Sequence, residues 1–182
     1  MLPQYSAICG ITVDEALDVF KPDIQVLAER YKCSYNEMVD KLKAKYDGYN
    51  FSMDSPDVFN PFSLTMALKN KMVDSYWFGS GTPTYLFEQM KRFGTNILTL
   101  EKNMALASDF DAPTENMTTA LPLLYQSGYL TIKDYDFDTN QYLLNFPNAE
   151  VRVGFMQNLL PVIVEDANVM LANNTIADIY KS

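Results

Sequence analysis

The chain has 182 residues, of which 48% are hydrophobic and 20% are charged, and it contains no histidine. The absence of histidine excludes a Ser-His-Asp triad, a Cys-His nucleophile pair, an imidazole general base and a His-containing zinc site. Its two cysteines are too few for an all-cysteine zinc site. The formal net charge of -9 disfavours nucleic acid as a partner, because an acidic surface repels phosphate.

The length suits one large domain or two small ones, since a chain of this size buries roughly 70% of its unfolded surface. The N-terminus lacks the basic and apolar regions of a signal peptide, and no apolar stretch reaches the ~18 residues of a membrane span. Cys9 and Cys33 are expected to be buried or half-buried thiols rather than a disulfide. We therefore expect a cytoplasmic protein.

The N-terminal third predicts a strand followed by a small helical array. Residues Tyr5 to Ile11 are apolar and suggest a strand whose neighbours are missing from the chain. The pattern from Thr12 to Glu15 is a capping box that opens a first helix, which should stop near Pro22. A second helix is expected from Asp23, and a third from the capping box that begins at Ser34.

Turn and helix-start signals continue after this array. Residues Tyr46 to Phe51 place an Asp-Gly pair between aromatics, which is typical of a tight hairpin. Asn60 and Pro61 suit the N-cap and first position of a helix. The pair Thr82-Pro83 repeats this device and predicts a helix that stops at Gly94.

The pattern loosens between Thr95 and Asn116, which we interpret as a domain boundary. The elements expected after it are a helix over Met117 to Gln126, a strand over Tyr129 to Ile132, a turn over Asp134 to Asn140, a strand over Gln141 to Leu144, and a long helix from near Asn148. Helix, strand, turn and strand in this order indicate a winged helix. The expected fold is thus mainly α with a small β component: a helical lid-like bundle over residues 1–94 and a winged-helix domain over residues 95–182.

Three motifs that resemble catalytic or metal sites lack essential members. The Gly-rich turn from Gly79 to Pro83 has no Walker A lysine. The alternating acids from Asp134 to Asn140 match part of an EF-hand, but Thr139 stands where the loop needs glycine and Asn145 where it needs glutamate. No acidic residue has lysine two positions later, as a restriction-type nuclease requires. We therefore predict no catalytic residue and no metal site in this chain, although a convergent pair of carboxylates stays open.

A winged helix can bind DNA through its second helix and its hairpin wing. The candidate recognition segment over residues 116–126 contains no lysine or arginine. The wing offers Lys133, but Asp134, Asp136 and Asp138 follow it and oppose contacts with phosphate. The sequence therefore favours a structural or protein-docking role over DNA binding.

Six strings of residues, in order along the chain, resemble the AAA-ATPase-like family found in Bacteroides and other anaerobes. They are Cys9-Gly10-Ile11-Thr12, Tyr46-Asp47-Gly48-Tyr49-Asn50-Phe51, Phe59-Asn60-Pro61-Phe62-Ser63, Tyr76-Trp77-Phe78 with Ser80-Gly81-Thr82-Pro83, Gln126-Ser127-Gly128-Tyr129-Leu130-Thr131-Ile132, and Phe146-Pro147-Asn148-Ala149-Glu150-Val151-Arg152. The resemblance implies an ATPase core before this region and often a restriction-type nuclease after it. This chain matches only the lid and winged-helix middle.

By this resemblance the chain itself binds no cofactor, and ATP and magnesium belong to the missing core. Lys91 and Arg92 are weak candidates for a basic lid residue that reaches a nucleotide. The matched residues are expected to be structural: Gly10, Thr12, Asp47, Gly48, Tyr49, Asn60, Pro61, Phe62, Gly81, Thr82, Pro83, Gly128, Tyr129, Pro147, Asn148 and Glu150.

The leading hypothesis is a non-catalytic segment that couples an ATPase core to a downstream domain or a protein partner. An alternative is a stand-alone protein-interaction module that docks through exposed aromatics at Tyr46, Tyr49, Phe51 and Trp77. A winged-helix DNA binder is a third hypothesis, disfavoured by charge.

Overall fold

The computed structural model describes residues 7–80, 84–95, 100, 103–110 and 117–164. The fold is mixed α/β and mainly helical, with two small antiparallel sheets. Its elements are β1 (Ile11–Thr12), α1 (Val13–Val19), α2 (Lys21–Tyr31), α3 (Tyr35–Tyr46), β2 (Val58–Phe59), α4 (Pro61–Asn70), η2 (Trp77–Ser80), α5 (Thr84–Arg92), β3 (Asn103–Leu106), α6 (Ala107–Phe110), α7 (Leu121–Gln126), β4 (Thr131–Asp136), β5 (Gln141–Asn145) and α8 (Ala149–Val164).

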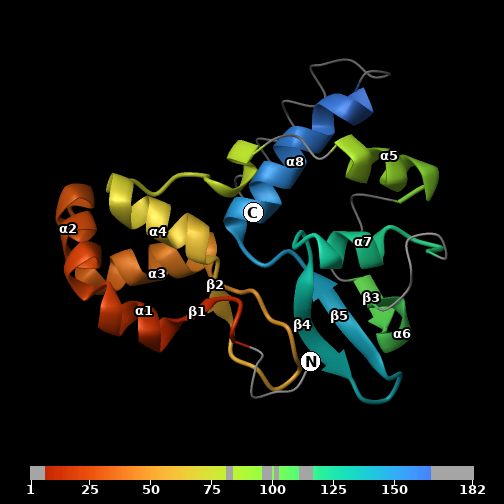
Figure 1. Ribbon diagram of the computed structural model, residues 1–182, viewed down its shortest axis with the longest axis horizontal. Coiled ribbons are helices and arrows are strands. Elements are labelled where there is room, and N and C mark those ends of the chain that lie inside the picture. The colour runs from red at the N-terminus through yellow and green to blue at the C-terminus, as the bar shows by residue number, and fades with distance from the viewer. Residues whose placement is uncertain (1–6, 81–83, 96–99, 101–102, 111–116, 165–182) are drawn as a thin grey trace.

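Two groups of elements lie at opposite ends of the molecule (Figure 1). We call α1–α4 with β1 and β2 the helical unit, and α5–α8 with η2 and β3–β5 the C-terminal unit. Helix α8 begins between them and makes contacts with both α3 and η2. The start of α8 is therefore the place where the two units meet.

The helix starts of the helical unit follow the predicted caps. At Thr12 the backbone N–H donates to Glu15 Oε2 at 2.8 Å while the Thr12 hydroxyl accepts from the Glu15 amide at 3.3 Å, and Ser34 with Glu37 repeats this box. Asn60 accepts from the amides of Phe62 and Ser63 and so caps α4. These predictions are confirmed because a cap needs only residues within one turn.

Helix α2 starts two residues earlier than predicted. It begins at Lys21, and Pro22 lies inside its first turn. Proline is tolerated there because the first amides of a helix have no intrahelical acceptor to lose.

The prediction that the first strand lacks neighbours is wrong. Strand β1 pairs antiparallel with β2, with Ile11 opposite Phe59 and Thr12 opposite Val58. Gly10 permits this approach, since a Cβ there would lie 2.2 Å from Val58 Cγ2. The predicted strand over Tyr5 to Ile11 is otherwise not formed within the described residues, because residues 7–10 make a turn.

The tight hairpin predicted at Tyr46 to Phe51 is also wrong. Tyr46 is the last residue of α3, and Gly48 turns the chain at φ +99°. Tyr49 then forms an isolated antiparallel bridge with Val58, nine residues further along the chain. An Asp-Gly turn would instead place the returning strand directly after Gly48. The Asp-Gly pair ends a helix here instead of linking two strands.

The C-terminal unit contains a three-stranded sheet in the order β3-β5-β4. Helix α7 starts at Leu121 and not at Met117, because Pro122 lacks an amide hydrogen and its ring would clash with a preceding helical turn. The amides of Tyr129 and Leu130 donate to the carbonyl of Leu124, so β4 begins at Thr131. The strand runs on through Asp136, and the predicted turn shrinks to residues 137–140. Strand β5 and the start of α8 agree with the prediction to within a residue.

The described residues form two apolar cores, and the second also takes in Tyr49 and Val58 from the helical side. The first cluster is built from α1–α4 and contains the fully buried Leu27, Met38, Leu42 and Tyr46. The second is built from the sheet, α7 and α8, and it includes Leu86, Phe87 and Met90 of α5. On packing grounds, the change from one core to the other therefore falls before α5.

Among the described residues, no helix is both long enough and apolar enough to cross a bilayer.

Candidate functional site

The segment that joins the two units, residues 71–77, is fixed by side chains from both of them. From the helical unit, the fully buried Tyr46 donates its hydroxyl proton to the Asp74 carbonyl at 2.7 Å and accepts from the Asp74 amide at 2.9 Å. Burial raises the pKa of the Tyr46 hydroxyl, which therefore stays a donor at neutral pH. We call this segment, together with residues 46–50, 131, 133 and 147–150, which link the two units, the joint.

From the C-terminal unit, Glu150 fixes the end of the same segment. Its Oε1 accepts hydrogen bonds from the backbone amides of Tyr76 at 2.6 Å and Trp77 at 3.0 Å. The side chain is 0% exposed, and its Oε2 makes no hydrogen bond. Because a buried carboxylate without partners is costly, these two charge-assisted bonds are what make the position tenable.

The start of α8 places Glu150 at this point. Asn148 accepts a hydrogen bond from the Val151 amide at 3.1 Å and so caps the helix, which leaves Glu150 in the first turn. A negative side chain in the first turn of a helix also interacts favourably with the helix dipole. The string Pro147-Asn148-Ala149-Glu150 is thus an anchor built on a helix N-terminus.

A second set of contacts ties the start of β4 to the turn after α3. Lys133 donates to the carbonyls of Gly48 at 2.6 Å and Pro147 at 3.2 Å. Burial lowers the pKa of the Lys133 ammonium, whereas Asp57 and Asp47 raise it. Burial has the opposite effect on an acid: it raises the pKa of the Asp47 carboxyl, while a hydrogen bond from the Gly48 backbone lowers it.

Thr131 adds a pair of hydrogen bonds beside Lys133. Its hydroxyl accepts from the Asn50 amide and donates to the Asn50 carbonyl, each at 2.7 Å. The backbone of the Tyr49–Asn50 stretch therefore lies alongside the start of β4. These contacts link residues 81 positions apart in the sequence.

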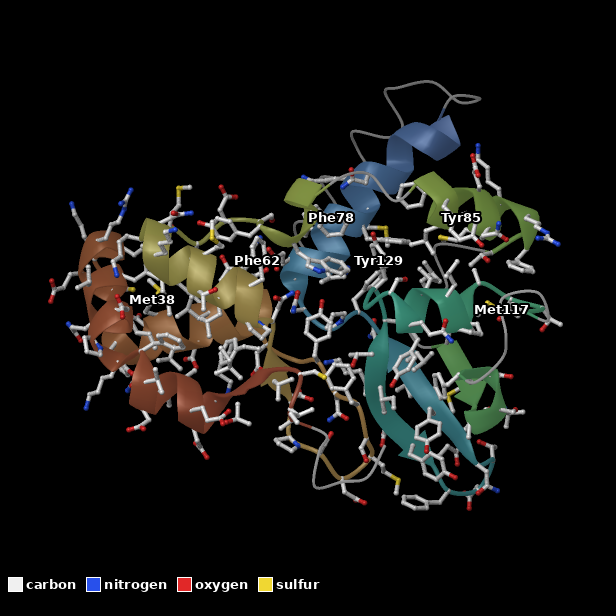
Figure 2. The ribbon with its side chains drawn as sticks, in the orientation of Figure 1. Met38, Phe62, Phe78, Tyr85, Met117 and Tyr129 are labelled. Atoms are coloured by element: carbon white, nitrogen blue, oxygen red, sulfur yellow. The ribbon has the colours of Figure 1, made fainter. Side chains whose placement is uncertain are left out.

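Aromatic rings fill the space between η2, the end of α7 and α8 (Figure 2). Tyr129 packs against Trp77, Phe78 and Phe155 with ring centroids 4.9, 5.9 and 5.2 Å apart. Burial raises the pKa of the Tyr129 hydroxyl to about 12. Gly154 makes room for this packing, because a Cβ there would lie 2.2 Å from the Phe78 ring.

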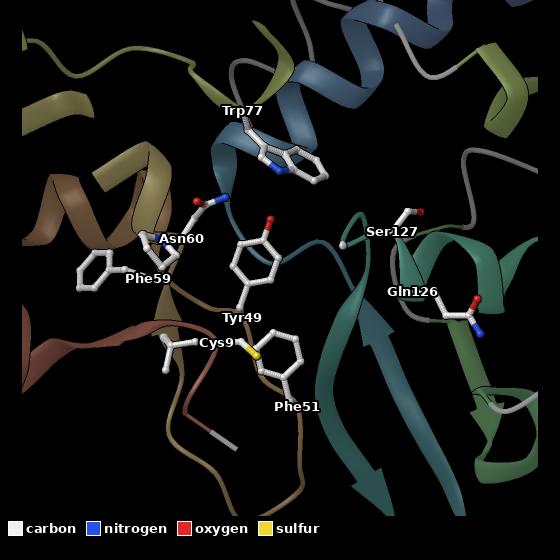
Figure 3. Close-up of a pocket in the computed structure, with 11 residues that line it drawn as sticks. Cys9, Tyr49, Phe51, Phe59, Asn60, Trp77, Gln126 and Ser127 are labelled. Atoms are coloured by element: carbon white, nitrogen blue, oxygen red, sulfur yellow. The ribbon is translucent and has the colours of Figure 1, made fainter. Parts of the chain in front are cut away.

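A cleft of about 320 Å³ opens beside the joint (Figure 3). Tyr49 and Trp77 line it from two sides, and the Asn60 amide points toward the Tyr49 hydroxyl. The lining residues are Cys9, Tyr49, Phe51, Val58, Phe59, Asn60, Pro61, Trp77, Gln126, Ser127 and Gly128. The lining contains no aspartate, glutamate, lysine or arginine, and it combines apolar side chains with uncharged polar ones.

Two expectations about this region need correction. Cys9 is exposed, not buried, and Cys33 is half-buried; both are free thiols. Tyr46 and Tyr49 are buried, at 0% and 8% exposure, and belong to different cores. They are therefore not available as docking aromatics, whereas Phe51 and Trp77 are only partly buried.

The structure brings most of the motif residues to one place. Asp47, Gly48, Tyr49, Pro147, Asn148 and Glu150 lie at the joint, Asn60, Pro61 and Gly128 line the cleft, and Tyr129 belongs to the aromatic cluster. Gly10 and Thr12 lie at β1, and Phe62 projects from α4 at 55% exposure. Gly81, Thr82 and Pro83 lie outside the described residues.

Lys91 and Arg92 lie at the end of α5, and both are exposed. The Arg92 guanidinium lies 5.6 Å from the centre of the Phe93 ring, and neither residue lines the cleft. Within the described part of the chain, no group of three or more acidic or cysteine side chains could hold a metal ion.

The sequence does not indicate that Tyr46, Thr131 and Lys133 make contacts at the joint. Lys133 was considered only as a phosphate ligand. Nothing in the sequence around Lys133 indicates that its partners are the carbonyls of Gly48 and Pro147.

The chain is 31% identical over 179 residues to a protein of Azotobacter chroococcum described as an uncharacterized protein in the vnfD 5′ region. The match covers 97% of this chain and 32% of the relative, so the chain spans about a third of the relative's length. No protein-family model matches the chain, and no solved structure matches it. The relative's description gives no activity, so the resemblance to the AAA-ATPase-like family stays a prediction.

Replacing Glu150 tests the anchor. We expect Glu150→Ala to lower the free energy of unfolding by about 2 kcal/mol, because it leaves two buried amides without an acceptor. Glu150→Gln keeps an oxygen acceptor in the same position and should cost less. Urea denaturation of the three proteins measures the difference, and equal losses in both variants would contradict the proposed hydrogen bonds.

Replacing Gly48 tests the close approach of the two units. A Cβ at Gly48 would lie 2.3 Å from the Pro147 carbonyl oxygen, whereas a Cβ at Gly94 would meet nothing within 4 Å. Both glycines have positive φ, at +99° and +59°, so Gly94→Ala is a matched control for backbone strain. Gly94→Ala should cost about 1 kcal/mol and Gly48→Ala clearly more, measured by the same denaturation experiment. Equal costs would contradict the contact.

Proposed function

We propose that this chain is a non-catalytic coupling segment of an AAA-ATPase-like protein, with a helical lid-like unit followed by a winged-helix domain. In this role it passes movements of an ATPase core to a downstream domain or protein partner. The observation that carries the proposal is the joint. Hydrogen bonds to Tyr46 and Glu150 hold the connecting segment from both sides. Lys133 and Thr131 add a second attachment, because they bind the backbone carbonyls of Gly48 and Asn50 in the helical unit.

Rigid attachment is what a coupling segment needs. Interfaces between domains of one chain usually permit relative motion, unless they are large and well packed. Here the packing of Tyr129 on Trp77, Phe78 and Phe155 fixes the end of the connecting segment within the C-terminal unit. The hydrogen bonds of Lys133 with Gly48 and of Thr131 with Asn50 then join that unit to the helical unit. A rotation of the helical unit would therefore move α8 and the sheet with it.

The order of elements in the C-terminal unit supports a winged helix. A first helix α5 is followed by β3, two helices, and the hairpin of β4 and β5, and the last strand pairs between the other two. In this proposal α7 is the second helix of the helix-turn-helix and the β4–β5 turn is the wing. Because α5 packs in the second core, the winged-helix domain would begin near residue 84 instead of residue 95.

Two further observations favour coupling over catalysis. The cleft beside the joint is lined by apolar and uncharged polar side chains. The Azotobacter relative extends well beyond the matched region, which leaves room in that protein for additional domains. Any ATPase or nuclease activity would belong to such domains.

The winged-helix proposal does not include DNA as the partner. Helix α7 has the sequence Leu-Pro-Leu-Leu-Tyr-Gln and carries no cation for phosphate. In the wing, the charge of Lys133 is held by two carbonyls at the joint. A protein surface is the partner that this charge distribution favours.

Coupling between the units predicts a single unfolding transition. Scanning calorimetry of the full chain should give one transition whose calorimetric and van't Hoff enthalpies agree. The double variant Glu150→Ala with Lys133→Met should separate it into two, because each core keeps its own contacts. Lys41→Met with Glu88→Ala changes exposed residues of the same types and should leave one transition. Two independent transitions in the unchanged chain would overturn the proposal.

Absence of a nucleotide site predicts that the chain alone does not bind ATP. Titration calorimetry with magnesium ATP should give no measurable heat of binding, because the proposal assigns the nucleotide to an ATPase core and not to this segment. Micromolar affinity would overturn the assignment as a coupling segment without a nucleotide site.

A further inference from the structure

Five aromatic side chains form a continuous row on the C-terminal unit, from the tip of the β4–β5 hairpin to α7. Phe137 contacts Tyr135, which contacts Tyr142, with ring centroids 5.0 and 4.8 Å apart. Tyr142 then contacts Phe110 at 5.4 Å, and Phe110 contacts Tyr125 at 4.5 Å. Figure 1 shows α6 and α7, which carry the last two rings, beside this sheet.

Strand register explains why the rings share one side. Tyr135 pairs with Tyr142, and Tyr142 pairs with Ala105, so all three lie on the same face of the sheet. Ala105 is buried in the second core, and Phe110, Tyr125 and Tyr142 pack against the edge of that core. Helices α6 and α7 add Phe110 and Tyr125 at the end of the row.

The row is accessible. Phe137 is 73% exposed, and the other four rings are each partly exposed. The row therefore combines one exposed ring at the hairpin tip with four half-buried rings behind it, and apolar surface of this kind marks a binding site.

Carboxylates accompany the rings along the hairpin. Asp134, Asp136 and Asp138 alternate with Tyr135 and Phe137 along the chain, and the strand register places Asp134 and Asp136 on the sheet face opposite Tyr135. Asp136 Oδ1 accepts from the amides of Asp138 at 2.8 Å and Thr139 at 3.2 Å. Hydrogen bonds from Thr139 and from the Asp138 backbone lower the pKa of Asp136, which keeps it ionised at neutral pH.

We propose that this aromatic row, formed by Phe110, Tyr125, Tyr135, Phe137 and Tyr142, binds an arginine-bearing segment of a protein partner. Guanidinium groups stack on aromatic faces, and arginine does so better than lysine because its charge is planar and weakly hydrated. The aspartates add an attractive field that selects a cation and speeds the encounter. The inference rests on the proposed function in one respect, that the C-terminal unit docks a protein.

Single-stranded nucleic acid is the other class of macromolecule that stacks on exposed rings. It would have to bring its phosphates to three aspartates, because the lysine of this hairpin donates to the Gly48 and Pro147 carbonyls. Charge therefore favours the cationic peptide, and the oligonucleotide serves as the opposing probe.

The test uses the full chain and fluorescence anisotropy with labelled probes. The probes are a short Arg-Gly repeat peptide, the same peptide with citrulline in place of arginine, and a short oligothymidylate. We expect the arginine peptide to bind about fivefold or more tightly than its neutral citrulline counterpart, and its affinity to fall with added salt. The oligothymidylate should not bind.

Variants locate the binding. Phe137→Leu keeps an apolar side chain but removes the π face, and Asp138→Asn removes one charge. Each should weaken binding of the arginine peptide, by about twofold to fivefold for the ring. Tyr85→Leu is the matched control, because Tyr85 is an exposed aromatic on α5 at 54% exposure. Unchanged unfolding midpoints will show that all three variants remain folded.

Three outcomes would overturn the inference: equal affinity for the arginine and citrulline peptides, equal effects of Phe137→Leu and Tyr85→Leu, or binding of the oligothymidylate in preference to the arginine peptide. A chain that unfolds in one transition but ignores the arginine peptide would keep the coupling proposal and refute this one. A chain that unfolds in two transitions but binds the arginine peptide would refute the coupling proposal and keep this one.

Discussion

The arrangement of this chain depends on one buried carboxylate. Glu150 Oε1 accepts the amides of Tyr76 and Trp77, and no water-exposed position would make these bonds as strong. The same bonds hold Trp77 where Tyr129 can pack on it. Because α8 belongs to the core of the C-terminal unit, a side chain in its first turn determines where the connecting segment runs and therefore where the helical unit sits.

The other contacts at the joint follow from this placement. Once α8 starts at the end of the connecting segment, the Pro147 carbonyl lies against the turn after α3, and only glycine fits at position 48. The carbonyls of Gly48 and Pro147 then converge, and Lys133 is the donor between them. The positive φ of Gly48, the hydrogen-bonded ammonium of Lys133 and the cap at Asn148 thus have a common geometric origin. Changes at these distant positions should therefore affect a single property, the attachment of the units.

Sequence reasoning located the local features of this fold and missed the distant ones. The caps at Thr12, Ser34 and Asn60 were predictable because each donor and acceptor lies within one turn of the other. The pairing of β1 with β2 joins residues about fifty positions apart, and two-residue strands carry no periodicity to announce it. Glu150 was identified only as part of a motif, since nothing near it in the sequence indicates that its partners are the amides of Tyr76 and Trp77.

The acidic hairpin illustrates how one pattern can have two physical causes. Carboxylates at every second position resemble the start of a calcium loop, but they also arise wherever a strand has one polar side. The register of β4 with β5 decides between these causes, because it places Tyr135 and Tyr142 together on one face and leaves Asp134 and Asp136 on the other. The intervening aromatics, which a metal-site interpretation ignores, are then the informative residues. They make the hairpin a two-sided element, with Tyr135 and Tyr142 on one face and Asp134 and Asp136 on the other. These aspartates therefore act on a cation at the rings through their electrostatic field and not by direct contact.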